Sequence, residues 1–174
     1  MRRVVTGLDD VGRSVIVSDT DVAPVRTRLL PGAEWQLLWS DDAPALGSAP
    51  PVGTPAYFPP PGGVRFGTFT LPPGDAAPPV GDDLAAARAE MDTVLPGLRE
   101  TLMTDSSGRH ATASVDLELV LAGEVTLELP DGQVARLRAG DTVVQNGAVH
   151  RWVNTGDVPA VIALVMLGVR AADR

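Results

Sequence analysis

Two histidines and two acids in the second half of the chain are the residues best suited to chemistry. His110 stands at the entrance to an apolar run in which Asp116 and Glu118 alternate with leucines, and His150 follows further along. Because the side chains of a strand alternate between its two faces, both acids share one face of this run. Burying two carboxylates is costly unless a metal ion, an arginine or a pocket open to water resolves the cost. The pattern predicts a functional site around these four residues.

Short strands separated by turns must position this site. From Ser114 onward, runs of β-forming residues alternate with Gly, Pro-Asp-Gly and Thr-Gly-Asp turns, which is typical of a sandwich or barrel and not of a parallel α/β sheet. Pro130-Asp131-Gly132 predicts a hairpin turn. The predicted strands are Val115 to Leu121, Glu124 to Leu129, Gln133 to Leu137, Thr142 to Val144, His150 to Asn154 and Ala160 to Leu167.

The first half of the chain has a different texture. Strands are predicted at residues 14–18, 34–39 and 64–71, whereas residues 41–63 are rich in Pro, Gly, Ala and Ser and predict a surface loop or strap. Apolar residues at helical spacing predict one helix from Asp82 to Leu95, capped by Asp82 or Asp83. The aromatic residues of this half are interpreted as packing for an N-terminal arm or a dimer seam: Trp35, Trp39, Tyr57 and Phe58.

Two passages, Gly108 to Glu124 and Gly140 to Asn154, resemble the two signature motifs of the cupin superfamily. In that family the first motif supplies a His-x-His pair and an acidic residue, followed by a glycine. The second motif supplies another histidine, with an asparagine four residues on. The match is incomplete, because Thr112 stands where the second histidine of the pair belongs.

The resemblance implies a fold class and a domain organisation. We expect an all-β chain with a double-stranded β-helix (jelly-roll) barrel, an N-terminal strand arm and one short helix. Residues 1–100 would form the arm, the strap and the helix, packed on a barrel core formed by residues 101–174. The two parts would make one structural domain.

The resemblance also implies a metal site. His110, Asp116 and His150 would be its protein ligands, and Glu118 would be a fourth ligand or a general base. Two imidazoles and a carboxylate with open positions are the set used by non-haem Fe(II), and the same set binds Zn(II), Mn(II) or Ni(II). The expected cofactor is therefore a divalent metal ion of unassigned identity.

Five further residues are assigned to the surroundings of the ligands. Gln145 or Asn154 would orient a ligating histidine, and Trp152 would belong to the core or the pocket wall. Arg65 would either pair with a substrate carboxylate or lie at the surface. Thr112 takes a ligand's place in the first motif.

Composition excludes several classes of function. The chain has 174 residues and a net charge of −8, which argues against nucleic acid as a partner. It has no cysteine, so disulfides and thiolate metal sites are excluded, and no apolar run approaches the roughly 20 residues of a membrane span. All basic residues are arginine, which indicates a GC-rich genome. We expect a cytoplasmic bacterial protein.

Three functions remain open at the level of sequence. The first is a metal-dependent cupin enzyme of the isomerase, dehydratase or decarboxylase type that acts on a small organic molecule. The second is an Fe(II) oxygenase that uses the same two histidines and carboxylate. The third is a cupin without catalytic activity that binds a small ligand or serves as a metal-free scaffold. A homodimer is expected, and the GC-rich composition suits secondary metabolism.

Overall fold

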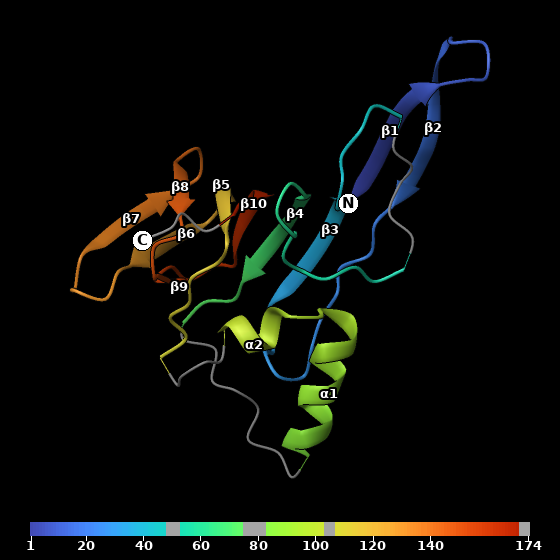
Figure 1. The fold of residues 1–174 in the computed structure, drawn as a ribbon. Helices are drawn as coiled ribbons and strands as arrows, with labels where there is room; N and C mark the ends of the chain where they lie inside the picture. The colour runs from blue at the N-terminus through green and yellow to red at the C-terminus, as the bar shows by residue number, and fades with distance from the viewer. Residues whose placement is uncertain (48–52, 75–82, 103–106, 171–174) are drawn as a thin grey trace.

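Strands dominate the structure, a computed structural model that describes residues 1–47, 53–74, 83–102 and 107–170. Ten strands and two helices are formed within these ranges (Figure 1). In chain order the elements are β1 (Arg2–Leu8), β2 (Ser14–Asp21), β3 (Glu34–Asp41), β4 (Val64–Leu71), α1 (Leu84–Val94), α2 (Leu98–Leu102), β5 (Ser114–Ala122), β6 (Glu124–Glu128), β7 (Val134–Arg138), β8 (Thr142–Asn146), β9 (Arg151–Val153) and β10 (Ala160–Gly168).

These strands form three antiparallel sheets. The largest has the order β3-β4-β10-β5-β8, a second has the order β7-β6-β9, and β1 pairs only with β2. The two larger sheets are joined by isolated bridges between Gly74 and Asn154 and between His110 and His150. The arrangement is an open jelly roll, because the strand ladder does not close into a ring among the described residues. The predicted all-β class and the six predicted C-terminal strands are confirmed.

A sharp corner at Gly123 separates β5 from β6 and sends the chain into the second sheet. Gly123 has φ +73, and a Cβ there would lie 2.7 Å from the carbonyl oxygen of Pro159. Only glycine adopts this backbone conformation without strain while the neighbouring loop packs so closely. The corner lets β5 contribute to one sheet and β6 to the other.

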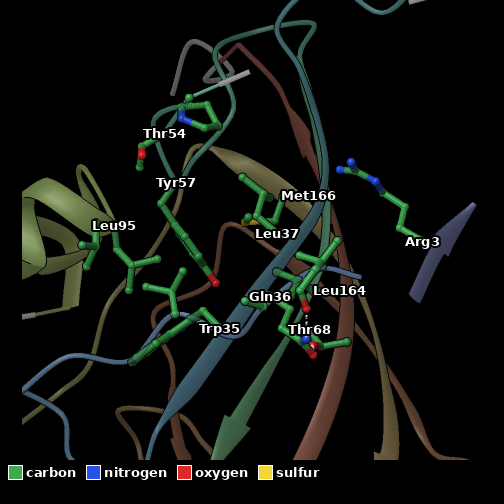
Figure 2. A pocket seen from close by; sticks show the side chains of 17 residues that line it. Arg3, Trp35, Gln36, Leu37, Thr54, Tyr57, Thr68, Leu95, Leu164 and Met166 are labelled. Carbon is green, nitrogen blue, oxygen red and sulfur yellow. Dashed lines mark hydrogen bonds between the residues drawn. The ribbon is translucent and has the colours of Figure 1, made fainter. Parts of the chain in front are cut away.

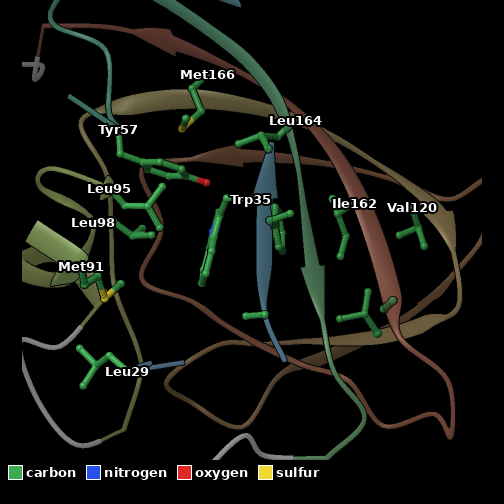
Figure 3. Packing of buried hydrophobic residues seen from close by; sticks show 14 of the residues in the cluster. Leu29, Trp35, Tyr57, Met91, Leu95, Leu98, Val120, Ile162, Leu164 and Met166 are labelled. Atoms are coloured by element: carbon green, nitrogen blue, oxygen red, sulfur yellow. The ribbon is translucent and has the colours of Figure 1, made fainter. Parts of the chain in front are cut away.

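The predicted helix is confirmed as α1, and the five-residue α2 follows it. The side chain of Asp83 accepts a hydrogen bond from the N–H of Ala86 and so caps α1, whereas Asp82 lies outside the described residues. Met91, Leu95 and Leu98 are buried against the barrel core (Figure 3). The helices therefore cover the barrel interior from one end (Figure 1).

The β1–β2 hairpin extends away from the body of the molecule as an arm (Figure 1). Arg3 connects it to the large sheet through a hydrogen bond from Nη1 to the carbonyl oxygen of Leu38 at 3.1 Å. A lone two-stranded hairpin is marginally stable in water. Several of its apolar side chains are exposed, among them Val4, Leu8 and Ile16.

Candidate functional site

Strand β5 places its acids inside the barrel and its leucines outside. The exposed fraction is 5% for Asp116 and 7% for Glu118, whereas it is 44% for Leu117. In the strand register Asp116 lies opposite Met166 and Glu118 opposite Leu164, both of which are buried. The prediction that the two acids share one face is confirmed. Their face is the buried one.

The two histidines meet at the point where the two larger sheets join. His110 and His150 each donate the main-chain N–H to the other's carbonyl oxygen at 2.9 Å, and their ring centroids are 4.4 Å apart. His110 Nδ1 lies 3.3 Å from the carbonyl oxygen of Gly108, and His150 Nδ1 lies 2.8 Å from that of Ala148. A proton on Nδ1 satisfies each of these carbonyl contacts and leaves Nε2 with a free lone pair.

Burial keeps both imidazoles neutral. Desolvation and, to a smaller extent, the neighbouring His150 lower the pKa of His110 to about 4, against the opposing effect of the bond to Gly108. The pKa of His150 is also lowered, chiefly by burial, although the bond to Ala148 and the charge of Asp116 act in the opposite direction. Neutral imidazole is the protonation state that binds a metal ion.

The two carboxyl groups carry oxygens without partners. Asp116 Oδ2 accepts a hydrogen bond from the Thr112 hydroxyl at 3.2 Å, but Asp116 Oδ1 and Glu118 Oε2 are buried without a hydrogen-bond partner. Burial raises the pKa of Asp116, and the nearby Ser114 hydroxyl, the Thr112 hydrogen bond and His150 oppose this shift. Burial and the charge of Asp116 raise the pKa of Glu118 to about 8. Thr112, which stands where the family pattern has a histidine, thus donates a hydrogen bond to Asp116 instead of binding a metal ion.

These side chains open into a cavity of about 760 Å³ in the barrel interior. A cavity of this size is ordinary for a small-molecule site. Aromatic and apolar side chains make up most of its wall, and polar groups converge at one part of it. The polar and charged lining residues include Thr112, Asp116, Glu118, His110, His150, Arg88 and Arg151.

Tyr57 also lines this cavity, which the sequence interpretation missed. It lies on the strap, it is buried, and its hydroxyl points into the barrel interior beside Trp35 and Leu164 (Figures 2 and 3). Tyr57 and Trp35 were interpreted as packing residues for the arm or a dimer seam. Both residues pack in the buried hydrophobic core, and both also form part of the cavity wall, which the sequence interpretation did not predict. The chain's only tyrosine, in a segment rich in Pro, Gly and Ala, was the available signal.

The residues that the sequence assigned to the surroundings of the ligands make different contacts in the structure. Trp152 lines the cavity, with its ring centroid 6.4 Å from that of His150. Asn154 Nδ2 donates to the carbonyl oxygens of Leu71 and Val158, so it supports loops and does not orient a histidine. The backbone carbonyl groups of Gly108 and Ala148 orient the two histidine rings instead. Gln145 is buried opposite Asp116 in the register, and its Nε2 has no partner.

Arg65 requires a correction. The alternatives from sequence were an arginine that pairs with a substrate carboxylate and one that lies at the surface. Its side chain is fully buried, at 0% exposed, and it is absent from the cavity wall. It bonds to the strap through Asp42 and Ala56. Strand alternation alone could not show that the strap covers it.

Comparison with known proteins agrees with this geometry. Residues 101–167 match the family model of the cupin domain. Residues 101–167 form a cupin domain. A solved structure with the same fold is the Cnp3 cupin domain of Schizosaccharomyces pombe, with a TM-score of 0.50 and 10% identity, covering 96% of this chain and 87% of that one.

Two fungal proteins match parts of this chain. The cupin-domain-containing oxidoreductase srdB of Neurospora crassa is 35% identical over 65 residues, which are 37% of this chain and 33% of that protein. The phomopsin biosynthesis cluster protein D of Diaporthe leptostromiformis is 44% identical over 45 residues, which are 26% of this chain and 24% of that protein. The match thus spans a third or less of each relative.

The donor set of the cupin domain fits a metal ion in part. The two buried neutral histidines present Nε2 atoms that form no hydrogen bond within the described residues. Asp116 has a buried oxygen without a partner. In the described ranges, however, no three His, Asp or Glu side chains are grouped closely enough to hold a metal ion together. The structure unites the histidine pair and leaves the third predicted ligand apart from it.

The described part of the chain contains no helix with the length and apolar character of a membrane span.

Proposed function

We propose that the cupin domain is the active site of a metal-dependent enzyme that acts on a small organic molecule by proton transfer. The observation that carries the proposal is the position of Glu118, which is buried in the cavity wall with Oε2 free of any partner. Reactions of the isomerase, dehydratase or decarboxylase type need a group that takes a proton from the substrate and returns it. Glu118 would take that role.

The electrostatic surroundings of Glu118 support this role. Burial and the nearby Asp116 raise its pKa to about 8, so the carboxyl group exists in both protonation states near neutral pH. A general acid or base works best when its pKa lies near the operating pH. Asp116 is held by Thr112 and so keeps its position beside Glu118.

His110 and His150 are the residues that would hold the metal ion, and Asp116, which lies apart from the pair, would complete the set only by moving toward it. Each histidine is fixed by a backbone carbonyl at Nδ1, which aims Nε2 away from the backbone. A bound divalent ion would supply Lewis acidity toward a carbonyl, carboxylate or enol oxygen of the substrate. The ring of Trp152 packs beside His150 and keeps bulk water from one side of it.

Two observations favour other functions. The relative from Neurospora crassa is named an oxidoreductase, which favours an Fe(II) oxygenase on the same two histidines and carboxylate. The separation of Asp116 from the histidine pair favours a cupin that binds a small ligand without metal. The relatives named as biosynthesis cluster proteins suit a role in secondary metabolism.

Hydrogen exchange with solvent tests the proposal. The purified chain is incubated in D₂O with a panel of small ketones, enols and β-keto acids, and deuterium incorporation is followed by NMR. We expect the wild type to catalyse exchange at a carbon next to a carbonyl, and Glu118→Gln to lose at least about 100-fold of that activity. The exposed Glu124 provides a matched control as Glu124→Gln. Equal exchange by wild type and Glu118→Gln would contradict the proposal.

A further inference from the structure

Tyr57 presents a hydroxyl group that the proposed reaction has not yet used. It is the chain's only tyrosine, its exposed fraction is 9%, and its hydroxyl points toward Trp35 in the interior (Figure 3). Within the described residues this hydroxyl forms no hydrogen bond. The oxygen is not among the fully buried polar atoms that lack a partner, so it is open to the cavity, where a ligand atom would accept its proton.

Tyr57 shares the cavity with the two acids of β5. Burial raises its pKa above the ordinary value, and the charges of Asp116 and Glu118 raise it further. The phenol therefore stays protonated and can act only as a neutral donor or acceptor. It stands at the wall formed by Trp35 and Leu164, which offers an apolar surface to a planar ring (Figure 3).

Arg65 fixes the strap that carries Tyr57. Its Nε donates to the carbonyl oxygen of Ala56 at 2.9 Å, one residue before Tyr57, and its Nη1 donates to that of Val64 at 3.0 Å. Its Nη2 lies 2.7 Å from Asp42 Oδ1 at the start of the strap, an ion pair whose angles are not those of a hydrogen bond. One fully buried guanidinium thus contacts the strap at its start, at Asp42, and again at Ala56 beside Tyr57.

Further contacts hold Tyr57 from its other sides. Its own N–H donates to the carbonyl oxygen of Pro96, which follows α1, at 2.9 Å. Its ring packs edge-on against Phe58, with centroids 5.0 Å apart. The end of the strap is tied to β10, since Gly168 donates to Gly63 and accepts from Gly62. Burying the charged side chain of Arg65 costs free energy. We attribute this cost to the need to hold Tyr57 in a fixed position.

We propose that Tyr57 donates a hydrogen bond to the reacting oxygen of a substrate that carries a phenol, enol or carbonyl group on a planar ring, and that Arg65 is the positioning residue for Tyr57. The inference rests on the proposed function, because it names the substrate class of the same cavity. A fixed neutral donor stabilises negative charge that develops on that oxygen. No bond is made or broken at Tyr57 itself.

Binding of p-nitrophenol tests the role of Tyr57 without requiring turnover. The probe is a planar ring with one acidic hydroxyl, and its affinity is measured by calorimetry for the wild type and Tyr57→Phe. We expect binding to the wild type and about tenfold weaker binding to Tyr57→Phe, because one hydrogen bond to the ligand is lost while the ring remains. Equal affinity of the two proteins, or no binding to the wild type, would overturn the assignment.

Absorbance of the phenolate tests the role of Arg65. Since Tyr57 is the only tyrosine, the ultraviolet titration reports this residue alone. We expect the wild-type phenol to ionise above the ordinary value of about 10 and Arg65→Lys to shift the midpoint down toward it. Arg26→Lys, in the exposed pair with Glu34, is the control and should leave the midpoint unchanged. If Arg65→Lys does not fold, Asp42→Asn takes its place, because it weakens the same ion pair from the exposed side. It should also shift the midpoint of the Tyr57 titration downward.

The outcomes separate this inference from the proposed function. Loss of probe affinity in Tyr57→Phe with no proton exchange by the wild type supports the ligand site and contradicts the catalytic role of Glu118. Unchanged affinity in Tyr57→Phe with exchange lost in Glu118→Gln supports the catalytic role and contradicts the role of Tyr57. An identical titration midpoint in wild type, Arg65→Lys and Asp42→Asn contradicts the positioning role of Arg65.

Discussion

His110 and His150 face one another where the two larger sheets meet, with ring centroids 4.4 Å apart and reciprocal main-chain hydrogen bonds of 2.9 Å. The main-chain bridge fixes both residues, and one backbone carbonyl at each Nδ1 fixes the ring. Neither histidine needs a metal ion to be held in place. The pair is therefore preorganised, which is what a binding site requires for high affinity.

The neutral histidines predict loss of stability in acid. In metal-free protein the unfolded chain binds protons on histidine near pH 6.5, whereas folded His110 does so only near pH 4. The unfolded state therefore binds more protons between these values, and the free energy of unfolding should fall as pH drops through this window. Urea unfolding at several pH values measures this slope. His110→Gln should reduce the slope, and an unchanged slope would show that His110 is not buried as a neutral base.

Glu118 predicts the opposite dependence at higher pH. Its folded pKa of about 8 lies above the value of about 4.5 expected in the unfolded chain, so the folded state binds the extra proton. Stability from this group is complete at acidic pH and is lost as pH rises toward 8. Metal-free Glu118→Gln should thus be more stable than wild type above pH 8, by a few kcal/mol at most. Thermal unfolding of both proteins, with Glu124→Gln as control, decides whether this difference exists.

Removal of the Thr112 hydroxyl should reduce the stability of the protein by a smaller amount. Its hydrogen bond to Asp116 is one of the interactions that lower the pKa of that buried acid. Thr112→Val keeps the shape and removes the donor, so it should cost about 1–2 kcal/mol of stability at neutral pH. Thr112→Ser keeps the donor and should stay close to wild type. Chemical denaturation of the three proteins measures the effect, and equal stability of the Val and Ser variants would contradict it.

The outer face of the large sheet predicts a homodimer. Phe66, Val165, Leu117 and Val144 are neighbours in the register across four strands, and three of them are more than a third exposed. An apolar row of this kind on a chain of net charge −8 is typical of a surface that a second protein covers. We expect a second copy of the chain there; the sequence interpretation also expects a homodimer, but it considers a seam in the N-terminal half of the chain.

Light scattering coupled to size-exclusion chromatography tests the dimer. Leu117→Glu should convert it to a monomer, because a charge at the centre of the row would be buried without a partner. Val134→Glu is the control, since Val134 is 59% exposed on β7 in the other sheet. A wild-type monomer, or a dimer that survives Leu117→Glu, would show that this face is not the interface.

Local signals made most of the barrel predictable. The alternation from Ser114 to Ala122 and the turn at Pro130-Asp131-Gly132 depend on neighbouring residues only, and both elements form as expected. The same alternation placed Asp116 and Glu118 on one face. It could not say which face is buried, and here the leucines lie outside.

The positions of Tyr57 and Asn154 could not be predicted, because both depend on contacts between segments that are distant in the sequence. Tyr57 enters the cavity because Arg65 and Pro96, from β4 and the end of α1, hold the strap there. Nothing within the strap itself encodes that position. Asn154 likewise bonds to Leu71, which is 83 residues away in the chain. Hydrogen bonds over such separations leave no local pattern in the sequence.

Elemental analysis of the chain purified without added metal tests the central claim, that His110 and His150 are ligands of a divalent metal ion in the cupin cavity. The wild type and the control Glu124→Gln should retain a stoichiometric metal ion, and His150→Ala should lose it while circular dichroism shows the same fold. Loss of one of two imidazole ligands typically removes the bound ion because affinity depends on every ligand. Wild-type protein without stoichiometric metal, or His150→Ala with an unchanged metal content, would contradict the claim.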